Sequence, residues 1–193
     1  MKGNTLYPVF LKLDQLQTLI VGGGNVGLEK LSGLLKSSPD AQITIVADFF
    51  LQEVTELATN ASSVTKIERK FEWSDLDNKD FVILATDDSE LHRSIKAETR
   101  KRNIITNVAD TPDLCDAYLG SIIQKGDLKI GISTNGKSPT LAKRMRQFFE
   151  EVIPEDLQDL MDNLREYRTT LKDDFQEKVK HLNDLTSSML DKK

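Results

Sequence analysis

The sequence is poor in the side chains that form disulfides and metal sites. Its 193 residues include one cysteine, Cys115, and two histidines, His92 and His181. A single cysteine excludes an intrachain disulfide and any metal or redox site of the Cys-x-x-Cys type. Two histidines argue against a zinc site built from protein ligands alone. We therefore expect no resident metal.

Long apolar runs and an excess of positive charge are lacking as well. No stretch reaches the roughly 18 apolar residues of a membrane span, and the first five residues do not open a signal peptide. The formal net charge of −5 argues against nucleic acid as the main partner, because phosphate binding needs a basic surface. We expect a cytoplasmic protein without a membrane or nucleic-acid partner.

Short β-branched runs alternate with helical patterns in the first half of the chain. This alternation predicts an α/β fold with a Rossmann-like parallel sheet and crossover helices. The expected strands are 17–21, 43–46, 64–68, 81–85 and 104–108, and the expected helices are 28–35, 51–59 and 89–102.

The pattern changes after residue 110. Two β runs, 118–124 and 128–134, are joined by Lys125-Gly126-Asp127, which is typical of a hairpin. A helix follows from Ser138-Pro139, and helical spacing resumes from residue 155. The expected parts are a Rossmann domain at 1–111, a hairpin-and-helix dimerisation and substrate segment at 112–153, and a helical C-terminal tail at 154–193.

A glycine-rich loop at residues 22–27 follows the first predicted strand and precedes a helix. That setting is typical of dinucleotide binding. Gly22 allows the tight turn, Gly24 lets the backbone approach a pyrophosphate, and Gly27 permits close packing of helix on strand. The helix N-terminus offers amides to the phosphates. The expected cofactor contacts in this loop are Gly22, Gly24, Asn25, Val26 and Gly27.

Two further residues are expected at the cofactor site, and the first of them favours NAD. Asp48 ends the second strand about twenty residues after the loop, where an acid binds the ribose 2′-hydroxyl of NAD. No arginine follows closely, which favours NAD over NADP. Thr86 closes the 81–85 strand at the edge where ligands bind. The alternatives are a structural glycine turn with a surface aspartate, and Asp87 or Asp88 serving as the cap of the next helix.

Several motifs along the chain resemble one family. They are YPVFL at 7–11, GGGNVGLEK at 22–30, ATDD at 85–88, NVAD at 107–110, LC at 114–115 and GKSP at 136–139. In this order and spacing they resemble the precorrin-2 dehydrogenase family, the oxidase and chelatase module of siroheme synthases. The resemblance covers residues 5 to 153, and the tail is similar only in general character.

The resemblance implies an activity. Precorrin-2 would lose a hydride to NAD⁺ and a proton, giving sirohydrochlorin, and some members also insert Fe²⁺ to make siroheme. It implies a homodimer and assigns the key aspartate to Asp110. A carboxylate just past the 104–108 strand could accept the proton. From position alone, a turn aspartate before Thr111-Pro112 is the alternative.

The substrate implied by the resemblance carries eight carboxylates. A helix N-terminus with a nearby cation is suited to such anions. Thr134 stands where the family often has serine, and Gly120 where proline is frequent. Basic residues on the helix after Ser138 are otherwise a solvated face. The expected substrate contacts are Asn107, Thr134, Asn135, Gly136, Lys137 and Ser138.

Other residues and functions complete the sequence-based expectations. Cys115 is interpreted as a small buried hydrophobe, and His92 as surface-facing and without a role. Dehydrogenase activity alone is preferred to a bifunctional enzyme. One rival is a nucleotide-sensing regulatory module that binds NAD without turnover, as on potassium channels. Another is a noncatalytic dimer scaffold that uses the helix at 155–180.

Overall fold

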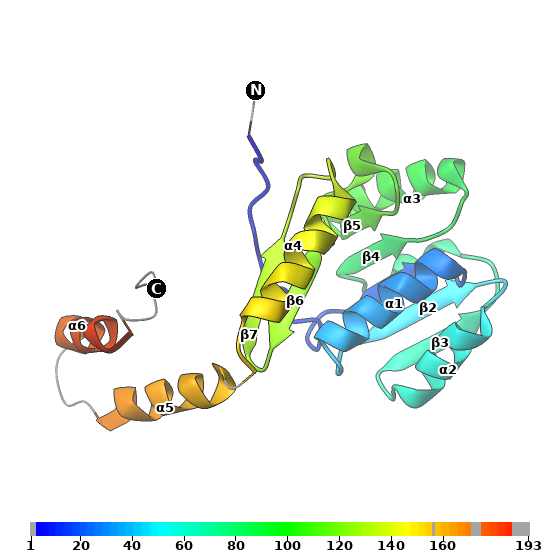
Figure 1. Cartoon of the computed structure of the whole chain (residues 1–193). Coiled ribbons are helices and arrows are strands. Elements are labelled where there is room, and N and C mark those ends of the chain that lie inside the picture. Colours follow the sequence, from blue (N-terminus) through cyan, green and yellow to red (C-terminus); the bar gives the residue numbers. More distant parts are fainter. Residues whose placement is uncertain (1–2, 156, 171–174, 187–193) are drawn as a thin grey trace. The chain divides into compact units, whose positions relative to one another are not determined.

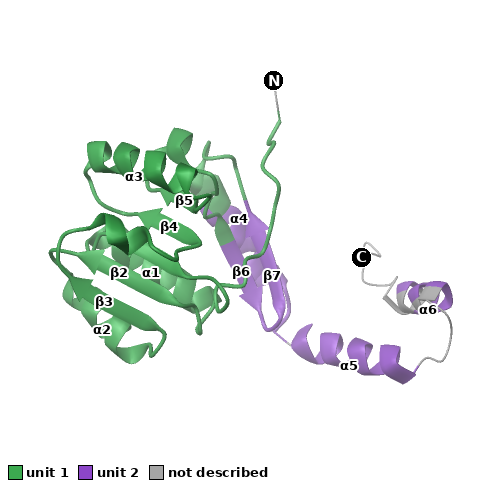
Figure 2. Ribbon diagram, turned by 180° about the vertical axis from the view of Figure 1, so that it is seen from behind, with its two compact units in different colours: residues 1–121, 133–142 green, residues 122–132, 143–193 purple. Residues whose placement is uncertain are grey.

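The computed structural model describes residues 3–155, 157–170 and 175–186. Figure 1 shows the order of the elements, and Figure 2 the division into two compact units. Unit 1 comprises residues 1–121 and 133–142, and unit 2 comprises 122–132 and 143–193. Parts of the predicted tail, residues 156, 171–174 and 187–193, lie outside the described residues. No helix of the described ranges is long and apolar enough to cross a membrane.

Unit 1 contains a five-stranded parallel sheet of order β3-β2-β1-β4-β5. Its strands are β1 Thr18–Val21, β2 Ile43–Ala47, β3 Val64–Glu68, β4 Phe81–Leu84 and β5 Ile105–Val108. Its helices are α1 Asn25–Ser37, α2 Gln52–Asn60 and α3 Ser89–Lys101, with short 3-10 turns η1 Trp73–Leu76 and η2 Pro112–Leu114. The predicted Rossmann-like sheet is thereby confirmed.

The register of the sheet sets up one functional edge. Val21 pairs with both Val46 and Leu84, and Leu84 pairs with Val108, so the strands end in one row. The loops that carry the glycine motif, Asp48, Thr86 and Asp110 all leave from this row. In such folds the ligand lies outside the carboxyl ends of the strands, where strand order reverses. Here that point lies between β1 and β4.

The sheet has a hydrophobic core on each face. α1 and α2 cover one face, where Leu31 and Val54 pack with sheet residues such as Ile20. α3 and η1 cover the other face, where Ile95 and Leu76 pack with sheet residues. The near-continuous apolar strands follow from burial on both faces, as expected for a parallel sheet.

Unit 2 contains a hairpin from residue 122 onward, the part of α4 from residue 143 onward, and two further helices. β6 Ser121–Lys125 pairs with β7 Leu128–Ile132 through a turn in which Gly126 has a φ of +56°. The helices are α4 Pro139–Val152, α5 Leu157–Thr170 and α6 Phe175–Thr186. The predicted hairpin and the helix after Ser138 are confirmed. The predicted tail helix consists of two helices in the described ranges.

An ion pair between the buried Asp75 and the partly exposed Arg69 fixes the connection from β3 to β4. Both oxygens of Asp75 accept from the guanidinium of Arg69, at 2.8 and 2.6 Å, and Oδ2 also accepts from the Glu72 amide at 2.8 Å. Asp75 is 8% exposed. Burial acts to raise the pKa of Asp75, but these hydrogen bonds outweigh it, so the pKa lies below its ordinary value of 3.8.

The lowered pKa of Asp75 predicts a pH-dependent contribution to stability. The charged form is favoured in the folded state, so its contribution is full above the unfolded pKa and is lost as pH falls through the folded pKa. Asp75→Asn is expected to lower the free energy of unfolding by about 1.5 kcal/mol at pH 7. Urea unfolding at pH 7 and at lower pH tests this. A deficit that stayed constant below the ordinary pKa would contradict it.

Candidate functional site

The glycine loop between β1 and α1 packs directly on its neighbours. Gly22 has a φ of +122°, and a Cβ there would lie 2.5 Å from the Ala85 carbonyl oxygen. A Cβ on Gly27 would lie 2.1 Å from the Gly22 carbonyl oxygen. Both glycines are therefore required by the fold itself. The first glycine also brings the loop against the end of β4, next to Thr86.

Gly24 differs from the other two motif glycines. It is the N-cap of α1, with a φ of −84° and a ψ of −162°, which any residue can adopt. A Cβ built on it would meet nothing within 4 Å. The fold gives no reason for a glycine here, but the close approach of a phosphate group would.

The start of α1 is suited to an anion. No side chain of the described chain caps it, and its first turn holds no acidic residue. By contrast, the Asp88 carboxylate caps α3 and accepts from the amides of Glu90 and Leu91 at 3.1 and 2.9 Å. The first amides of α1 are thus open to a ligand, and the helix dipole favours a negative charge there. The loop fits the pyrophosphate of a dinucleotide.

Asp48 and Thr86 follow their strands at the same edge. Asp48 comes directly after β2 and is exposed. Thr86 is half-buried, and its hydroxyl lies 2.8 Å from Nε2 of His92. Of the two aspartates interpreted as an alternative cap of the next helix, Asp87 and Asp88, it is Asp88 that caps α3.

The interpretation of His92 as surface-facing was wrong. His92 is 4% exposed and lies on the buried stripe of α3 with Ile95 and Thr99. Of the charged neighbours that suggested exposure, Arg93, Arg100 and Lys101 are exposed. The fourth, Lys96, lies one turn after His92 on the same side of the helix, with its side chain 15% exposed and paired with Asp116. Burial lowers the pKa of the His92 imidazole, and the fields of Asp88 and Asp87 only partly offset this. The ring is therefore neutral at physiological pH.

Asp110 lies in the turn after β5. The residue is exposed and has a φ of +56°, in the left-handed region that aspartate tolerates better than most side chains. Thr111 closes the turn, with its amide 3.4 Å from the Val108 carbonyl. The turn thereby places Asp110 at the carboxyl edge of the sheet, one strand from the loop that carries Thr86.

Cys115 anchors the two ends of the Asp110 turn. Its sulfur accepts from the Val108 amide at 3.2 Å and lies within donor range of the carbonyls of Val108 and Thr111, at 3.2 and 3.5 Å. Burial raises the pKa of this thiol, so it stays protonated and can donate. The residue expected to be a small buried hydrophobe is only half-buried, and it also positions the turn.

Asn107, expected to contact the substrate, forms its side-chain hydrogen bond within the protein. Its side chain is buried, and Nδ2 donates to the Ala117 carbonyl at 2.9 Å. The 115–117 segment is further held by Asp116, which accepts from the Thr106 amide at 3.0 Å and pairs with Lys96. These bonds fix the path of the chain that leaves the Asp110 turn.

The segment at residues 134–138 forms a tight loop. Thr134 Oγ1 accepts from the Ser138 amide and donates to the Ser138 carbonyl, both at 3.2 Å. Asn135 and Gly136 are both left-handed, with φ values of 54° and 72°. Lys137 is exposed, and Ser138 Oγ caps α4 by accepting from the Leu141 amide at 3.2 Å. The Thr134 hydroxyl and the Ser138 amide thus satisfy each other within the loop.

Tyr118 connects this loop with the Asp110 turn, a role that sequence reasoning missed. Its hydroxyl donates to the Pro112 carbonyl at 3.3 Å. Its ring lies 3.9 Å from where a Cβ of Gly136 would be. The ring therefore stands between the turn after Asp110 and the loop before α4. An isolated aromatic residue after the LC pair gave no sequence signal for this position.

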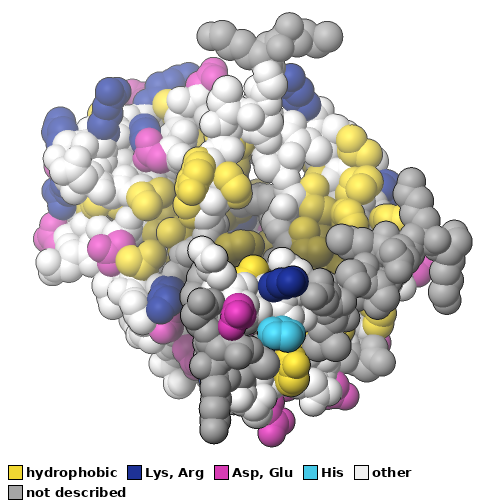
Figure 3. Space-filling model, turned by 90° about the vertical axis from the view of Figure 1, so that its left-hand side faces the viewer, with side chains coloured by type: hydrophobic (Ala, Val, Ile, Leu, Met, Phe, Trp, Pro, Cys, Tyr) yellow, Lys and Arg dark blue, Asp and Glu magenta, His cyan; other side chains and the backbone are white. Residues whose placement is uncertain are grey.

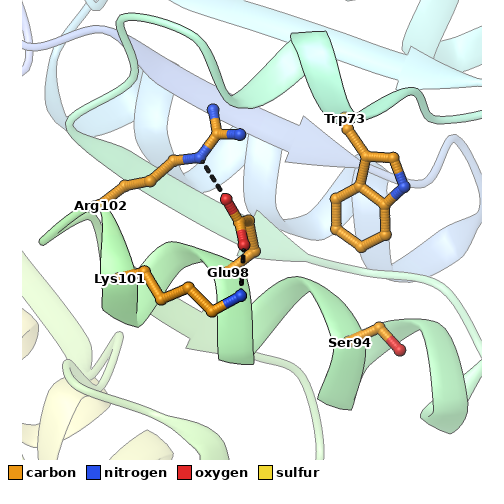
Figure 4. A pocket seen from close by; sticks show the side chains of 5 residues that line it. All are labelled: Trp73, Ser94, Glu98, Lys101 and Arg102. Carbon is orange, nitrogen blue, oxygen red and sulfur yellow. Dashed lines mark hydrogen bonds and ion pairs between the residues drawn. The ribbon is translucent and has the colours of Figure 1, made fainter.

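A shallow cavity of about 410 Å³ lies elsewhere in unit 1, between η1 and α3. Figure 4 shows Glu98 between Lys101 and Arg102, with which it forms ion pairs of 2.9 Å each, and Trp73 across from it. Lys101 ends α3 just before β5 begins, so this cavity is at the amino end of the sheet. Within the described residues, no group of three or more His, Cys, Asp or Glu could hold a metal ion.

Comparison with known proteins identifies the family. A family model described as putative NAD(P)-binding matches residues 9–121, which is more than half of the chain. The chain belongs to this putative NAD(P)-binding family. A second family model, described as sirohaem biosynthesis protein central, matches residues 125–151.

Relatives of this NAD(P)-binding chain include siroheme synthases. The one from Pseudoalteromonas atlantica is 37% identical over 169 residues, which cover 88% of this chain and 36% of the relative. The one from Nitrosomonas europaea is 32% identical over 174 residues, which cover 90% and 35%. The chain thus spans about a third of the length of these relatives.

The solved structure named SirC, precorrin-2 dehydrogenase, shares the fold. Its TM-score is 0.75 at 24% identity, and the match covers 93% of this chain and 89% of that chain. Together with the two family matches, the relatives confirm the resemblance predicted from the motifs. The family match also confirms the nicotinamide dinucleotide expected from the glycine loop.

Proposed function

We propose that this protein oxidises precorrin-2 to sirohydrochlorin with NAD⁺ in siroheme biosynthesis. The observation that carries the proposal is the common edge of the sheet. There the glycine loop, Thr86 and the Asp110 turn follow three adjacent strands. A dinucleotide site and an exposed carboxylate thereby share one side of the domain. The siroheme synthase relatives supply the substrate class.

In the proposed reaction the substrate loses one hydride and one proton. NAD⁺, when bound, accepts the hydride that leaves the tetrapyrrole. The Asp110 carboxylate accepts the proton released from the same substrate, so two hydrogens and two electrons leave in total. The exposed Lys137 and the left-handed backbone at 135–136 are proposed to bind substrate carboxylates. Tyr118, which contacts both segments, fixes the position of that loop relative to the Asp110 turn.

Asp48 is proposed to select NAD over NADP. Its exposed carboxylate, at the end of β2, would accept from the ribose 2′-hydroxyl and repel a 2′-phosphate. The glycine loop and the first amides of α1 would hold the pyrophosphate. A cytoplasmic location stays a prediction from the sequence.

An anaerobic assay tests the activity. Purified protein is mixed with enzymatically made precorrin-2 and NAD⁺, and NADH absorbance and the sirohydrochlorin spectrum are followed. Equimolar appearance of both is expected, and subsequent addition of Fe²⁺ tests for metal insertion. NAD binding without turnover would contradict the proposal and favour the nucleotide-sensing module.

A homodimer is proposed, with the hairpin and α4 of unit 2 in the interface. Of the described residues of this unit, Ile123 is the large side chain that is fully buried. Phe148 and Val152, four residues apart on one side of α4, are 53% and 52% exposed. Hydrophobic side chains at the surface are yellow in Figure 3. A second copy of the chain would remove such side chains from water.

Phe148→Asp combined with Val152→Asp is expected to convert a dimer into a monomer. Two buried carboxylates in an apolar interface cost far more than the contacts they replace. Light scattering coupled to size exclusion measures the mass, and Val179→Asp, at an exposed valine of α6, serves as the matched control. A dimer that survives the double substitution would place the interface elsewhere.

A further inference from the structure

The hydrogen bond between His92 and Thr86 has no counterpart in the function described so far. The two side chains come from different elements: Thr86 follows β4, and His92 lies on the first turns of α3. Their bond of 2.8 Å joins a buried imidazole to the hydroxyl of the residue after Ala85. The carbonyl of Ala85 packs against Gly22 of the glycine loop.

We propose that His92 is a positioning residue of the dinucleotide site, which fixes the Thr86 hydroxyl for a hydrogen bond to NAD. The inference rests on the proposed NAD site. A hydroxyl has one proton and two lone pairs, and the bond to His92 uses one of these three positions. The remaining two are thereby oriented relative to the glycine loop rather than free to rotate.

The local structure makes His92 suitable for this task. Asp88 fixes the start of α3 by capping its amides, and the His92 amide donates to the Asp88 carbonyl at 3.0 Å. The residue is 4% exposed and lies on the buried face of α3 with Ile95 and Thr99, so packing restricts the ring to few orientations. Since burial favours the neutral ring, the pair carries no charge that would attract or repel the dinucleotide phosphates.

A simpler alternative is that His92 fills space in the core and Thr86 satisfies its polar nitrogen. The two alternatives differ in what they predict for NAD affinity. A space-filling histidine affects stability alone, whereas a positioning histidine affects affinity through Thr86. If His92 acts through Thr86, then in a variant without the Thr86 hydroxyl the further loss of His92 should not change NAD affinity.

A double-mutant cycle on the full chain tests the proposal, with NADH fluorescence titration as the probe. His92→Leu and Thr86→Val, which keep bulk but remove the hydrogen bond, are each expected to raise the Kd about fivefold. The double variant is expected to bind no more weakly than either single variant. His92→Asn, which keeps a polar group, is expected to recover part of the affinity.

Thr99→Val is the matched control. Thr99 is buried on the same stripe of α3 and accepts from the Thr106 hydroxyl at 2.7 Å, toward the other end of the helix. This variant is expected to lower Tm and leave the Kd for NADH within twofold. Should His92→Leu fail to fold, Thr86→Val and His92→Asn still test the pair.

Four results decide between these outcomes. An unchanged Kd in Thr86→Val, or effects of the two single substitutions that multiply in the double variant, would overturn the proposal. Wild-type protein that binds NADH and fails to oxidise precorrin-2, with the cycle coupled as expected, would support the pair and overturn the proposed activity. Wild-type protein that binds no NADH would overturn both.

Discussion

Asp110→Asn is expected to slow precorrin-2 oxidation by about 100-fold or more while leaving the Kd for NADH within about threefold. Asparagine has nearly the shape of aspartate and tolerates the left-handed backbone that this turn requires. The substitution therefore removes the proton acceptor without straining the loop. Single-turnover measurement of NADH formation, together with NADH titration, separates loss of chemistry from loss of binding.

Asp113→Asn is the matched control for this experiment. Asp113 is an exposed carboxylate in η2, three residues further along the same connection. It is expected to retain wild-type turnover, which would exclude a general effect of negative charge near the site. Normal turnover in Asp110→Asn would remove Asp110 from the proton transfer and leave the role of the turn to its backbone.

The sheet and its functional edge were predictable because they depend on short-range patterns. Buried parallel strands are apolar runs, and the helices between them carry periodic apolar residues, so the chain specifies the order locally. The glycine loop needed only its position between a strand and a helix. From these two facts Asp48, Thr86 and Asp110 were all expected at one edge, and the register confirms that the four strands that lead to these loops end in one row.

Contacts between distant side chains were less predictable, for different reasons. The burial of His92 had a sequence signal, because His92, Ile95 and Thr99 recur at helical spacing. The charged residues next to His92 nevertheless led to the prediction that it faces solvent. The internal pairing of Thr134 with Ser138, and the anchoring of the Asp110 turn by Cys115, depend on loop geometry. No periodic pattern encodes such geometry.

Gly24→Ala is expected to leave the free protein intact and to raise the Kd for NADH about tenfold. Its backbone angles suit alanine, and the added methyl group would meet no protein atom within 4 Å. The methyl group would occupy the space through which a pyrophosphate approaches the first amides of α1. The larger Gly24→Val should weaken binding further. Thermal unfolding and NADH titration of the same samples measure the two properties.

Two other glycines serve as controls for Gly24→Ala. Gly33, in the middle of α1, also has open space around it, so Gly33→Ala should raise stability by up to about 1 kcal/mol and leave NADH binding unchanged. Gly27→Ala should instead unfold or strongly destabilise the protein, because its methyl group would overlap the Gly22 carbonyl. Only a glycine kept for a ligand combines normal stability with lost affinity. If Gly24→Ala binds NADH as well as wild type, the pyrophosphate does not approach α1 through this loop, and the dinucleotide must lie elsewhere along the edge of the sheet.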